Sequence, residues 1–165
     1  MKKILISMHL PDEIAKKYSK EFVLEYPKHA NSFSPEELLA KLSDVSGYLG
    51  GPLTREMIDN APILEIASSF GAGFDHIDHE YAGEKGVLVM NAPHATTDST
   101  AELTIAIMLC LSRKIINFSN YMRKTGTCTG ITPFVDPIEG VGIPTIMSGK
   151  ILGIVGFGKI GKGVI

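Results

Sequence analysis

Short apolar runs alternate with helix signals through much of this chain, and that alternation leaves few folds open to it. Each run is rich in Val, Ile or Leu and has the length of a buried β-strand. We expect strands at residues 3–8, 22–26, 45–49, 64–68 and 87–90. Strands that alternate with helices favour a parallel sheet with helices packed on its faces. The sequence therefore predicts an α/β fold with a doubly wound, flavodoxin-like parallel sheet.

Capping residues predict helices between these strands. Pro11 can open one helix, because proline suits the first helical turn. Ser34 and Glu37 form a capping box around a proline, so a helix begins there. Thr54 and Asp78 are placed as N-caps of two further helices, which run to residues 59 and 84.

Ligands of such sheets bind outside the carboxyl ends of the parallel strands. The expected strand ends bring five stretches of the chain to one rim of the sheet. These stretches are residues 9–10, 27–28, 50–51, 70–74 and 91–94.

A glycine-rich motif follows an apolar run near the end of the chain. Residues 151–155 are expected to form a strand, and Gly156-Phe157-Gly158-Lys159-Ile160-Gly161 follows it with the spacing G-x-G-x-x-G. Such glycines allow a tight turn, approach of a pyrophosphate and close helix packing. The free N–H groups of the following helix favour an anion. The motif predicts dinucleotide binding, and the alternative is a strand-to-helix turn without a ligand.

A second glycine pair follows the fourth expected strand. Gly71 and Gly73 flank Ala72, and successive backbone N–H groups in such a loop can form a nest for an anion. A carboxylate would suit this nest. A tight turn that needs glycine only for its dihedral angles remains the alternative.

The order of several motifs resembles the D-isomer-specific 2-hydroxyacid dehydrogenases, the group of glyoxylate/hydroxypyruvate reductase, D-lactate dehydrogenase and phosphoglycerate dehydrogenase. The similar blocks span essentially the whole chain, at residues 71–78, 86–93, 100–103, 111–113 and 149–161. Three residues depart from the common family pattern: Phe74 is bulkier, His76 stands where Asn is frequent, and Lys159 replaces a common Arg.

The resemblance implies roles for particular residues. Gly50, Gly51, Ala72 and Gly73 would form the substrate side, with the substrate carboxylate on the backbone of Ala72 and Gly73. Thr100 would face the nicotinamide side of the cofactor cleft, residues 156–161 would bind the pyrophosphate of NAD or NADP, and Asp75 and Asp78 would be structural. The family's catalytic arginine, glutamate and histidine are expected beyond Ile165, so we expect no catalytic residue within the chain.

The domain organisation that follows has four parts. We expect a flavodoxin-like substrate domain at 1–98, interdomain or dimerisation helices at 99–125, a connector at 126–149, and the first strand and helix of a Rossmann domain at 150–165. The long helix should be capped by Asp98 or Ser99, and its apolar residues at 103–111 should be buried between domains or subunits. The second helix is expected at 115–123.

Two functional interpretations stay open at this point. The first is an NAD(P)-dependent oxidoreductase that interconverts small 2-hydroxy acids and 2-keto acids, present as an N-terminal portion. The second is a truncated, non-catalytic fragment or binding module of the same family. In the first interpretation the expected partners are a small 2-keto or 2-hydroxy acid and a second copy of the chain.

Charge and cysteine content limit the partners and the compartment that we expect for the protein. A net charge of −2 without a basic cluster argues against binding to nucleic acid or to an anionic membrane. Cys110 and Cys128 show no metal-ligand spacing, so we expect free thiols in a cytoplasmic protein without a metal site. His9 and His94 fall on the predicted rim, where a histidine is more often a hydrogen-bonding neighbour than a proton donor.

Overall fold

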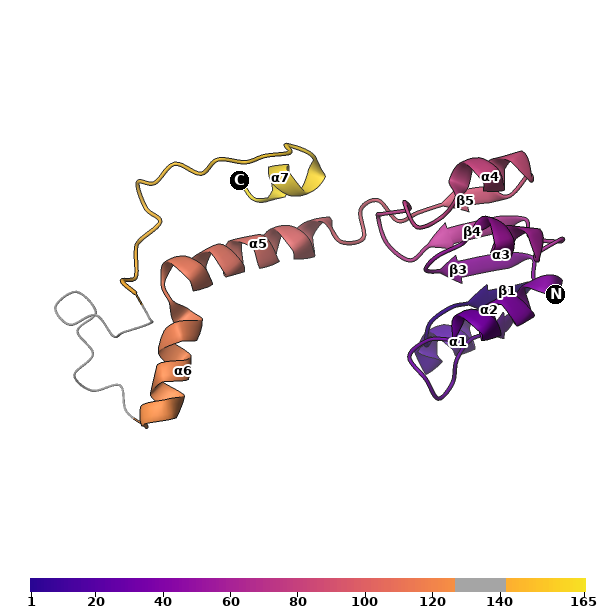
Figure 1. The fold of residues 1–165 in the computed structure, drawn as a ribbon, viewed down its shortest axis with the longest axis horizontal. Coiled ribbons are helices and arrows are strands. Elements are labelled where there is room, and N and C mark those ends of the chain that lie inside the picture. Colours follow the sequence, from indigo (N-terminus) through magenta and orange to yellow (C-terminus); the bar gives the residue numbers. More distant parts are fainter. Residues whose placement is uncertain (127–141) are drawn as a thin grey trace. The chain divides into compact units, whose positions relative to one another are not determined.

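The computed structural model describes residues 1–126 and 142–165. Its contacts divide the chain into two compact units, Met1–Ala95 and Thr96–Ile165 (Figure 1). The expected connector at 126–149 lies largely outside the described residues, and so does the expected free thiol of Cys128.

A five-stranded, wholly parallel sheet forms the centre of the first unit. Its strand order is β2-β1-β3-β4-β5, which confirms the flavodoxin-like order expected from the sequence. The strands are β1 (Lys3–Ile6), β2 (Val23–Glu25), β3 (Gly47–Gly50), β4 (Ile66–Ser69) and β5 (Leu88–Met90).

Short helices connect these strands, and the two longest helices, α5 and α6, belong to the second unit. In the first unit they are α1 (Asp12–Tyr18), α2 (Pro35–Lys41), the 3-10 turn η1 (Leu42–Asp44), α3 (Arg55–Asp59) and α4 (His79–Glu84). In the second unit they are α5 (Thr97–Ser112), α6 (Ile115–Thr125) and α7 (Lys159–Gly163).

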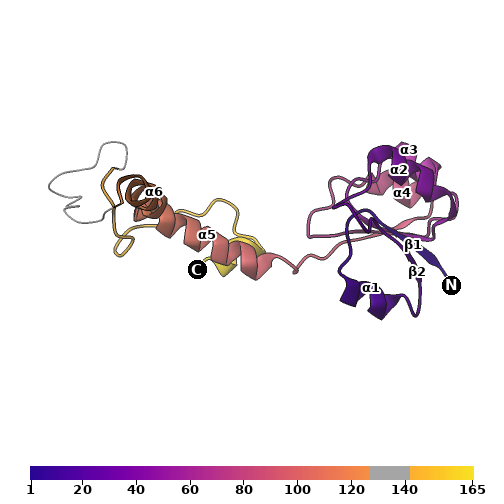
Figure 2. The same ribbon diagram turned by 90° about the horizontal axis from the view of Figure 1, so that it is seen from below.

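Helices cover both faces of the sheet. Figure 2 shows α1 on one face and α2, α3 and α4 on the other. Successive strand residues point to opposite faces, so Leu5 packs with Leu42 and Tyr48 beneath α2 to α4, while Ile6 packs with Leu10 on the α1 side. The larger core lies beneath the three helices.

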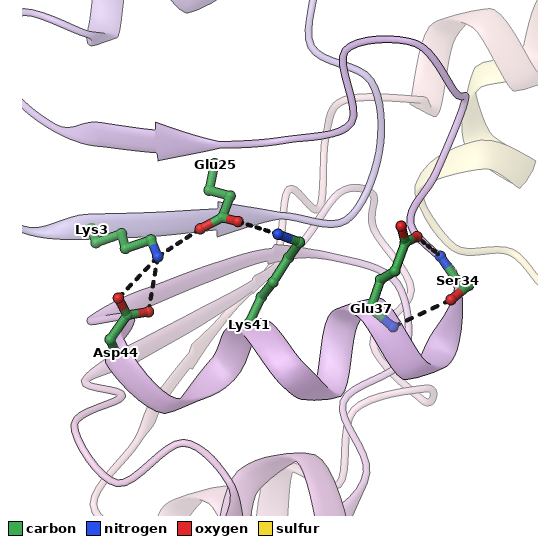
Figure 3. Close-up of polar contacts among 6 residues, drawn as sticks. All are labelled: Lys3, Glu25, Ser34, Glu37, Lys41 and Asp44. Carbon is green, nitrogen blue, oxygen red and sulfur yellow. Dashed lines mark hydrogen bonds and ion pairs between the residues drawn. The ribbon is translucent and has the colours of Figure 1, made fainter.

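The capping box at the start of α2 is present as the sequence predicts. The amide of Ser34 donates to a carboxylate oxygen of Glu37 at 2.8 Å, and the amide of Glu37 donates to the Ser34 hydroxyl at 3.2 Å (Figure 3). Thr54 and Asp78 likewise accept hydrogen bonds from the amides of Met57 and Tyr81. These caps satisfy backbone N–H groups that would otherwise lack partners.

Removal of one cap gives a first testable prediction. We expect Ser34→Ala to lower the free energy of unfolding by about 1 kcal/mol, because the amide of Glu37 loses its side-chain acceptor. Urea unfolding followed by circular dichroism measures the loss. Ser43→Ala, at an exposed serine in η1, is the control and should leave the unfolding midpoint unchanged. Equal stability of the two variants would contradict a stabilising role for the box.

An ion-pair network joins β1 and β2 to the region of α2 and η1. Glu25 lies 2.6 Å from the Lys3 ammonium and 2.5 Å from that of Lys41, and Lys3 also lies 2.9 Å from Asp44 (Figure 3). Burial alone would raise the pKa of Glu25, but the hydrogen bonds from Lys3 and Lys41 outweigh it and lower that pKa. The carboxylate is therefore stabilised in its charged form in the folded state.

This lowered pKa predicts a loss of stability in acid. A carboxyl group with a depressed folded-state pKa stabilises the fold fully above its ordinary value of 4.5, and the stabilisation is lost as pH falls through the folded-state value. We expect Glu25→Gln to cost on the order of 1 kcal/mol near neutral pH and much less in acid. Urea midpoints measured across this range test the expectation. The exposed Glu21→Gln should retain the wild-type pH dependence.

The second unit corrects the expected start of α5. The helix begins at Thr97, before the expected caps Asp98 and Ser99, because the amide of Thr100 already bonds to the carbonyl of Thr96 at 3.0 Å. Its apolar residues, which are expected to be buried between domains or subunits, are uncovered within this unit: Leu103 is 58% exposed and Leu111 is 66% exposed. Within the described residues only Ala101 of α5 is buried. The helix therefore presents a largely uncovered apolar surface.

The strand expected at residues 151–155 is absent, so that prediction was wrong. Ile151 and Val155 are fully exposed, and no strand of the described residues pairs with this segment. A β-strand is defined by hydrogen bonds to a neighbour, and an apolar run alone does not supply one. The following helix, α7, does form, so the strand-to-helix element is present only in its second half.

Within residues 1–126 and 142–165, no helix has both the length and the hydropathy needed to cross a bilayer.

Candidate functional site

The carboxyl ends of four adjacent strands form the candidate site. Gly50 at the end of β3 pairs in register with Ser69 at the end of β4, and Ser68 pairs with Met90 of β5. The amide of Ser7, just after β1, donates to the carbonyl of Leu49 at 2.9 Å. The loops that follow β1, β3, β4 and β5 therefore meet at one edge, as expected for a parallel sheet.

Close contact with Ser7 fixes the two glycines at the end of β3, Gly50 and Gly51. The Ser7 hydroxyl is buried and accepts a hydrogen bond from the amide of Gly51 at 3.1 Å. A Cβ atom placed on Gly50 would lie 1.8 Å from that hydroxyl oxygen and 2.6 Å from the Ser7 Cβ. Only glycine fits at Gly50, whereas a Cβ on Gly51 would meet no atom within 4 Å. Gly51 therefore has open space in front of it.

A cavity of about 640 Å³ opens at the point where the strand order reverses, between β1 and β3. Flavodoxin-like sheets bind ligands at this switch point. Ser7 and Gly51 line this cavity, and so do the acidic residues Glu36 and Glu56. The remaining wall is largely apolar, from Met8, Phe33, Leu38, Leu39 and Met57.

The loop after β4 carries unused backbone donors. Within the described residues, the amides of Ala72 and Gly73 donate no hydrogen bond, and both residues are at least partly exposed. Their loop is nevertheless held on the carbonyl side: the Asn91 side-chain amide donates to the Ala72 carbonyl at 2.7 Å, and the Ala92 amide donates to the Gly71 carbonyl at 3.0 Å. Two adjacent free N–H groups in a fixed loop can bind an anion such as a carboxylate.

The two acidic residues of this loop, Asp75 and Asp78, differ in their contacts. Asp78 caps α4 and lies 2.7 Å from the guanidinium of Arg55. Chiefly because of that hydrogen bond, the pKa of Asp78 is lowered. Asp75 is exposed and forms no ion pair within the described residues. Asp78 thus has the structural role expected for it.

The histidines near the rim have neighbours of different kinds. The His9 ring nitrogen Nδ1 lies 3.1 Å from the Pro27 carbonyl, and the ring packs edge-on against Tyr26. His76 contacts the hydroxyl of buried Ser69 through Nε2 at 3.3 Å. His94 is exposed beside the rim. His9 is therefore engaged in holding two loops together.

The glycine-rich motif of the second unit forms a tight turn into α7. Gly156 has a φ of +89°, which a residue with a side chain rarely adopts, and Gly158 is the N-cap of the helix. A Cβ on Gly161 would lie 2.4 Å from the Gly156 carbonyl oxygen. The first and third glycines of the motif thus have a backbone or steric reason within this turn, whereas a Cβ on Gly158 would meet no atom within 4 Å. Phe157, Lys159 and Ile160 are exposed along it.

Thr100 lies in the first turns of α5, within the same unit. Its side chain is partly buried, and its carbonyl accepts a hydrogen bond from the Thr104 hydroxyl at 2.8 Å. Nearby, a Cβ on Gly163 would lie 3.1 Å from the Cβ of Ala101, so α7 packs closely on the start of α5. Within this unit, Thr100 therefore lies near the helix that follows the glycine motif.

Several residues of the rim were missed by sequence reasoning. Ser7 and Ser69 are buried hydroxyls at strand ends, and nothing in their immediate sequence separates them from surface serines. Asn91 lies in the stretch 91–94 that the sequence placed on the rim, but its hydrogen bond to the Ala72 carbonyl was not predicted. No group of three or more His, Cys, Asp or Glu side chains able to hold a metal occurs in residues 1–126 and 142–165.

Comparison with known proteins gives a consistent result. Residues 4–154 match the family model of the D-isomer specific 2-hydroxyacid dehydrogenase catalytic domain. The chain is 31% identical over 163 residues to a glyoxylate reductase of Thermococcus litoralis, a match that covers 97% of this chain and 48% of that protein.

Solved structures agree in fold. A 2-hydroxyacid dehydrogenase from Ketogulonicigenium vulgare superposes with a TM-score of 0.75 at 26% identity, over 99% of this chain and 50% of that one. The NADPH-dependent glyoxylate/hydroxypyruvate reductase of Sinorhizobium meliloti, solved with NADP and malonate, gives 0.72 at 23% identity, over 99% and 48%, a likeness of fold alone. The chain spans about half the length of the relatives that it matches.

Proposed function

The chain belongs to the D-isomer-specific 2-hydroxyacid dehydrogenase family. On that premise we propose that it forms part of an NAD(P)-dependent oxidoreductase. The reaction would interconvert a small 2-keto acid and the corresponding D-2-hydroxy acid. NAD or NADP would supply or accept the hydride. This chain would bind and orient the acid and contribute the first part of the dinucleotide site.

The observation that carries this proposal is the pair of free amides at Ala72 and Gly73. They lie at the carboxyl edge of the sheet, next to the strand end at Gly50, which the family resemblance assigns to the substrate side. A carboxylate bound there would receive two N–H donors without a charged side chain. The cavity beside Gly51 offers space for the rest of a small acid.

The glycine turn supports the cofactor half of the proposal. The residues that would surround the pyrophosphate are Gly156, Phe157, Gly158, Lys159, Ile160 and Gly161. The close contact between Gly156 and Gly161 leaves no room for a side chain at Gly161, while the open space in front of Gly158 would let a pyrophosphate approach the backbone. Thr100 would face the nicotinamide side. The choice between NAD and NADP is left to experiment.

The same proposal includes domains and assembly. We retain a substrate domain at 1–98, helices at 99–125, a connector at 126–149 and the beginning of a nucleotide-binding domain at 150–165. The exposed apolar residues of α5 favour a homodimer, because so much uncovered apolar surface is unusual for a free helix. The free thiol of Cys110 supports a cytoplasmic location.

Oxidation of NADH and NADPH by the intact protein, with glyoxylate, hydroxypyruvate and pyruvate as substrates, tests the proposal. We expect reduction of at least one acid. Gly73→Val should raise KM at least about tenfold, because its side chain has open space in the free protein but would cover the amide.

Gly83→Val, on α4, is the matched control, since a Cβ there also meets nothing within 4 Å. It should leave KM unchanged. Binding of acid and cofactor without turnover would favour a non-catalytic module. If Gly73→Val turns over the acid with an unchanged KM, the substrate carboxylate does not bind to this loop.

A further inference from the structure

Ser69 lies directly before the loop whose amides are proposed to bind the substrate carboxylate. It is the last residue of β4 and is 3% exposed. Its backbone is fixed by the sheet, because it pairs in register with Gly50 of β3. A side chain in this position is held by the core while its hydroxyl faces the loop.

Three groups of the loop surround the Ser69 hydroxyl oxygen. It lies 2.6 Å from the carbonyl oxygen of Gly73, 3.3 Å from the amide nitrogen of Gly71 and 3.3 Å from Nε2 of His76. These partners come two, four and seven residues after the serine. One buried hydroxyl thus contacts the beginning, the middle and the end of the loop.

Proton counting assigns the direction of each hydrogen bond. A hydroxyl has one proton to donate and two lone pairs that accept. The Gly73 carbonyl can only accept, so it takes the hydroxyl proton, in agreement with the shortest of the three distances. The Gly71 amide can only donate. His76 must therefore donate from Nε2, and the Ser69 hydroxyl is then saturated.

The same arrangement explains why the amides of Ala72 and Gly73 stay free. The carbonyl of Gly73 is held by Ser69, the carbonyl of Ala72 by Asn91, and the carbonyl of Gly71 by the amide of Ala92. All three peptide carbonyls are thus fixed, and the N–H groups between them are left for a ligand. Fixed donors bind an anion better than donors that must first be ordered.

We propose that Ser69 is the positioning residue of the carboxylate-binding loop and that His76 completes it by donating from Nε2 to the Ser69 hydroxyl. The inference rests on the proposed function, in which this loop binds the substrate carboxylate. Neither side chain touches the substrate. They act by holding the amides of Ala72 and Gly73 in place.

Binding of oxamate, an unreactive mimic of a small 2-keto acid, tests the proposal. The probe is titrated into the intact ¹⁵N-labelled protein, with and without NADH, while the amide resonances of Ala72 and Gly73 are followed. We expect Ser69→Ala to weaken binding about tenfold, the equivalent of one or two lost hydrogen bonds. Ser68→Ala is the matched control. In the part of the chain that the structure describes, that hydroxyl hydrogen-bonds only to the Ser69 carbonyl, so its loss should leave affinity unchanged.

Variants at His76 keep the test meaningful if Ser69→Ala fails to fold, because His76 is exposed. His76→Gln places an amide N–H donor at similar reach and should retain affinity. His76→Leu removes the donor and should weaken binding severalfold. In the wild type, the neutral His76 ring should carry its proton on Nε2, and Ser69→Ala should accelerate hydrogen exchange at the Gly71 amide.

The possible outcomes separate the two proposals. If the wild type shows no saturable shift at Ala72 and Gly73, the proposed function is overturned, and this inference with it. If the wild type binds oxamate and Ser69→Ala and His76→Leu bind it equally well, only the positioning role is overturned. A neutral His76 protonated on Nδ1 would also contradict it, because Nε2 could not then donate.

Discussion

Gly50→Ala is expected to destabilise the protein by roughly 3 kcal/mol, the largest effect on stability that we anticipate from one added methyl group. The new Cβ would lie 1.8 Å from the Ser7 hydroxyl oxygen and 3.3 Å from the Ser7 backbone nitrogen. Ser7 is buried and bonded to Gly51, so it cannot rotate away without cost. The ends of β1 and β3 would have to separate. Urea unfolding followed by circular dichroism measures the effect.

The neighbouring glycine provides the control. Gly51→Ala adds the same methyl group where no atom lies within 4 Å, and it should change the free energy of unfolding by less than about 0.5 kcal/mol. If both variants lost equal stability, a general effect of glycine replacement would explain the result better than the contact with Ser7.

Gly161→Ala is expected to weaken dinucleotide binding by the intact protein about a hundredfold. Its Cβ would lie 2.4 Å from the carbonyl oxygen of Gly156, the residue that makes the tight turn at a φ of +89°. The turn would open, and the N–H groups at the start of α7 would lose their direction. Isothermal titration calorimetry with NADH and NADPH measures the loss.

Gly153→Ala is the matched control for this variant. It precedes the turn, has no positive φ and has no atom within 4 Å of an added Cβ. Binding should be retained. Tight binding by Gly161→Ala would show that the nucleotide does not depend on this turn, and the proposed cofactor residues would have to be withdrawn.

Local signals in the sequence predicted much of the first unit. The capping box at Ser34 and the N-caps Thr54 and Asp78 were predicted correctly because each depends on residues only three positions apart. The five strands were also predicted, although all five are shorter than the apolar runs suggested, because strand ends depend on neighbours in the sheet. The alternation of strands and helices predicted a parallel sheet, and the flavodoxin-like order was expected from that type of fold.

Features that depend on distant neighbours were not predicted. The segment from Ile151 to Val155 has the residues of a strand, but pairing decides the outcome and no described strand lies beside it. The burial of Ser7 and Ser69 likewise arises from strand register. The glycines at the candidate site were identified from the sequence, whereas the hydroxyl groups that hold them were not.

The position of Gly50 between two buried serines links the cavity to the anion loop. Ser7 holds the backbone after Gly50 on one side, and Ser69 pairs with Gly50 on the other. A change that enlarges the cavity by moving the end of β3 would therefore also displace the loop with the free amides. Selection for a larger acid would meet a trade-off here, in which space for the side chain is gained at the expense of carboxylate affinity. Compensating substitutions should then arise in pairs across this strand end.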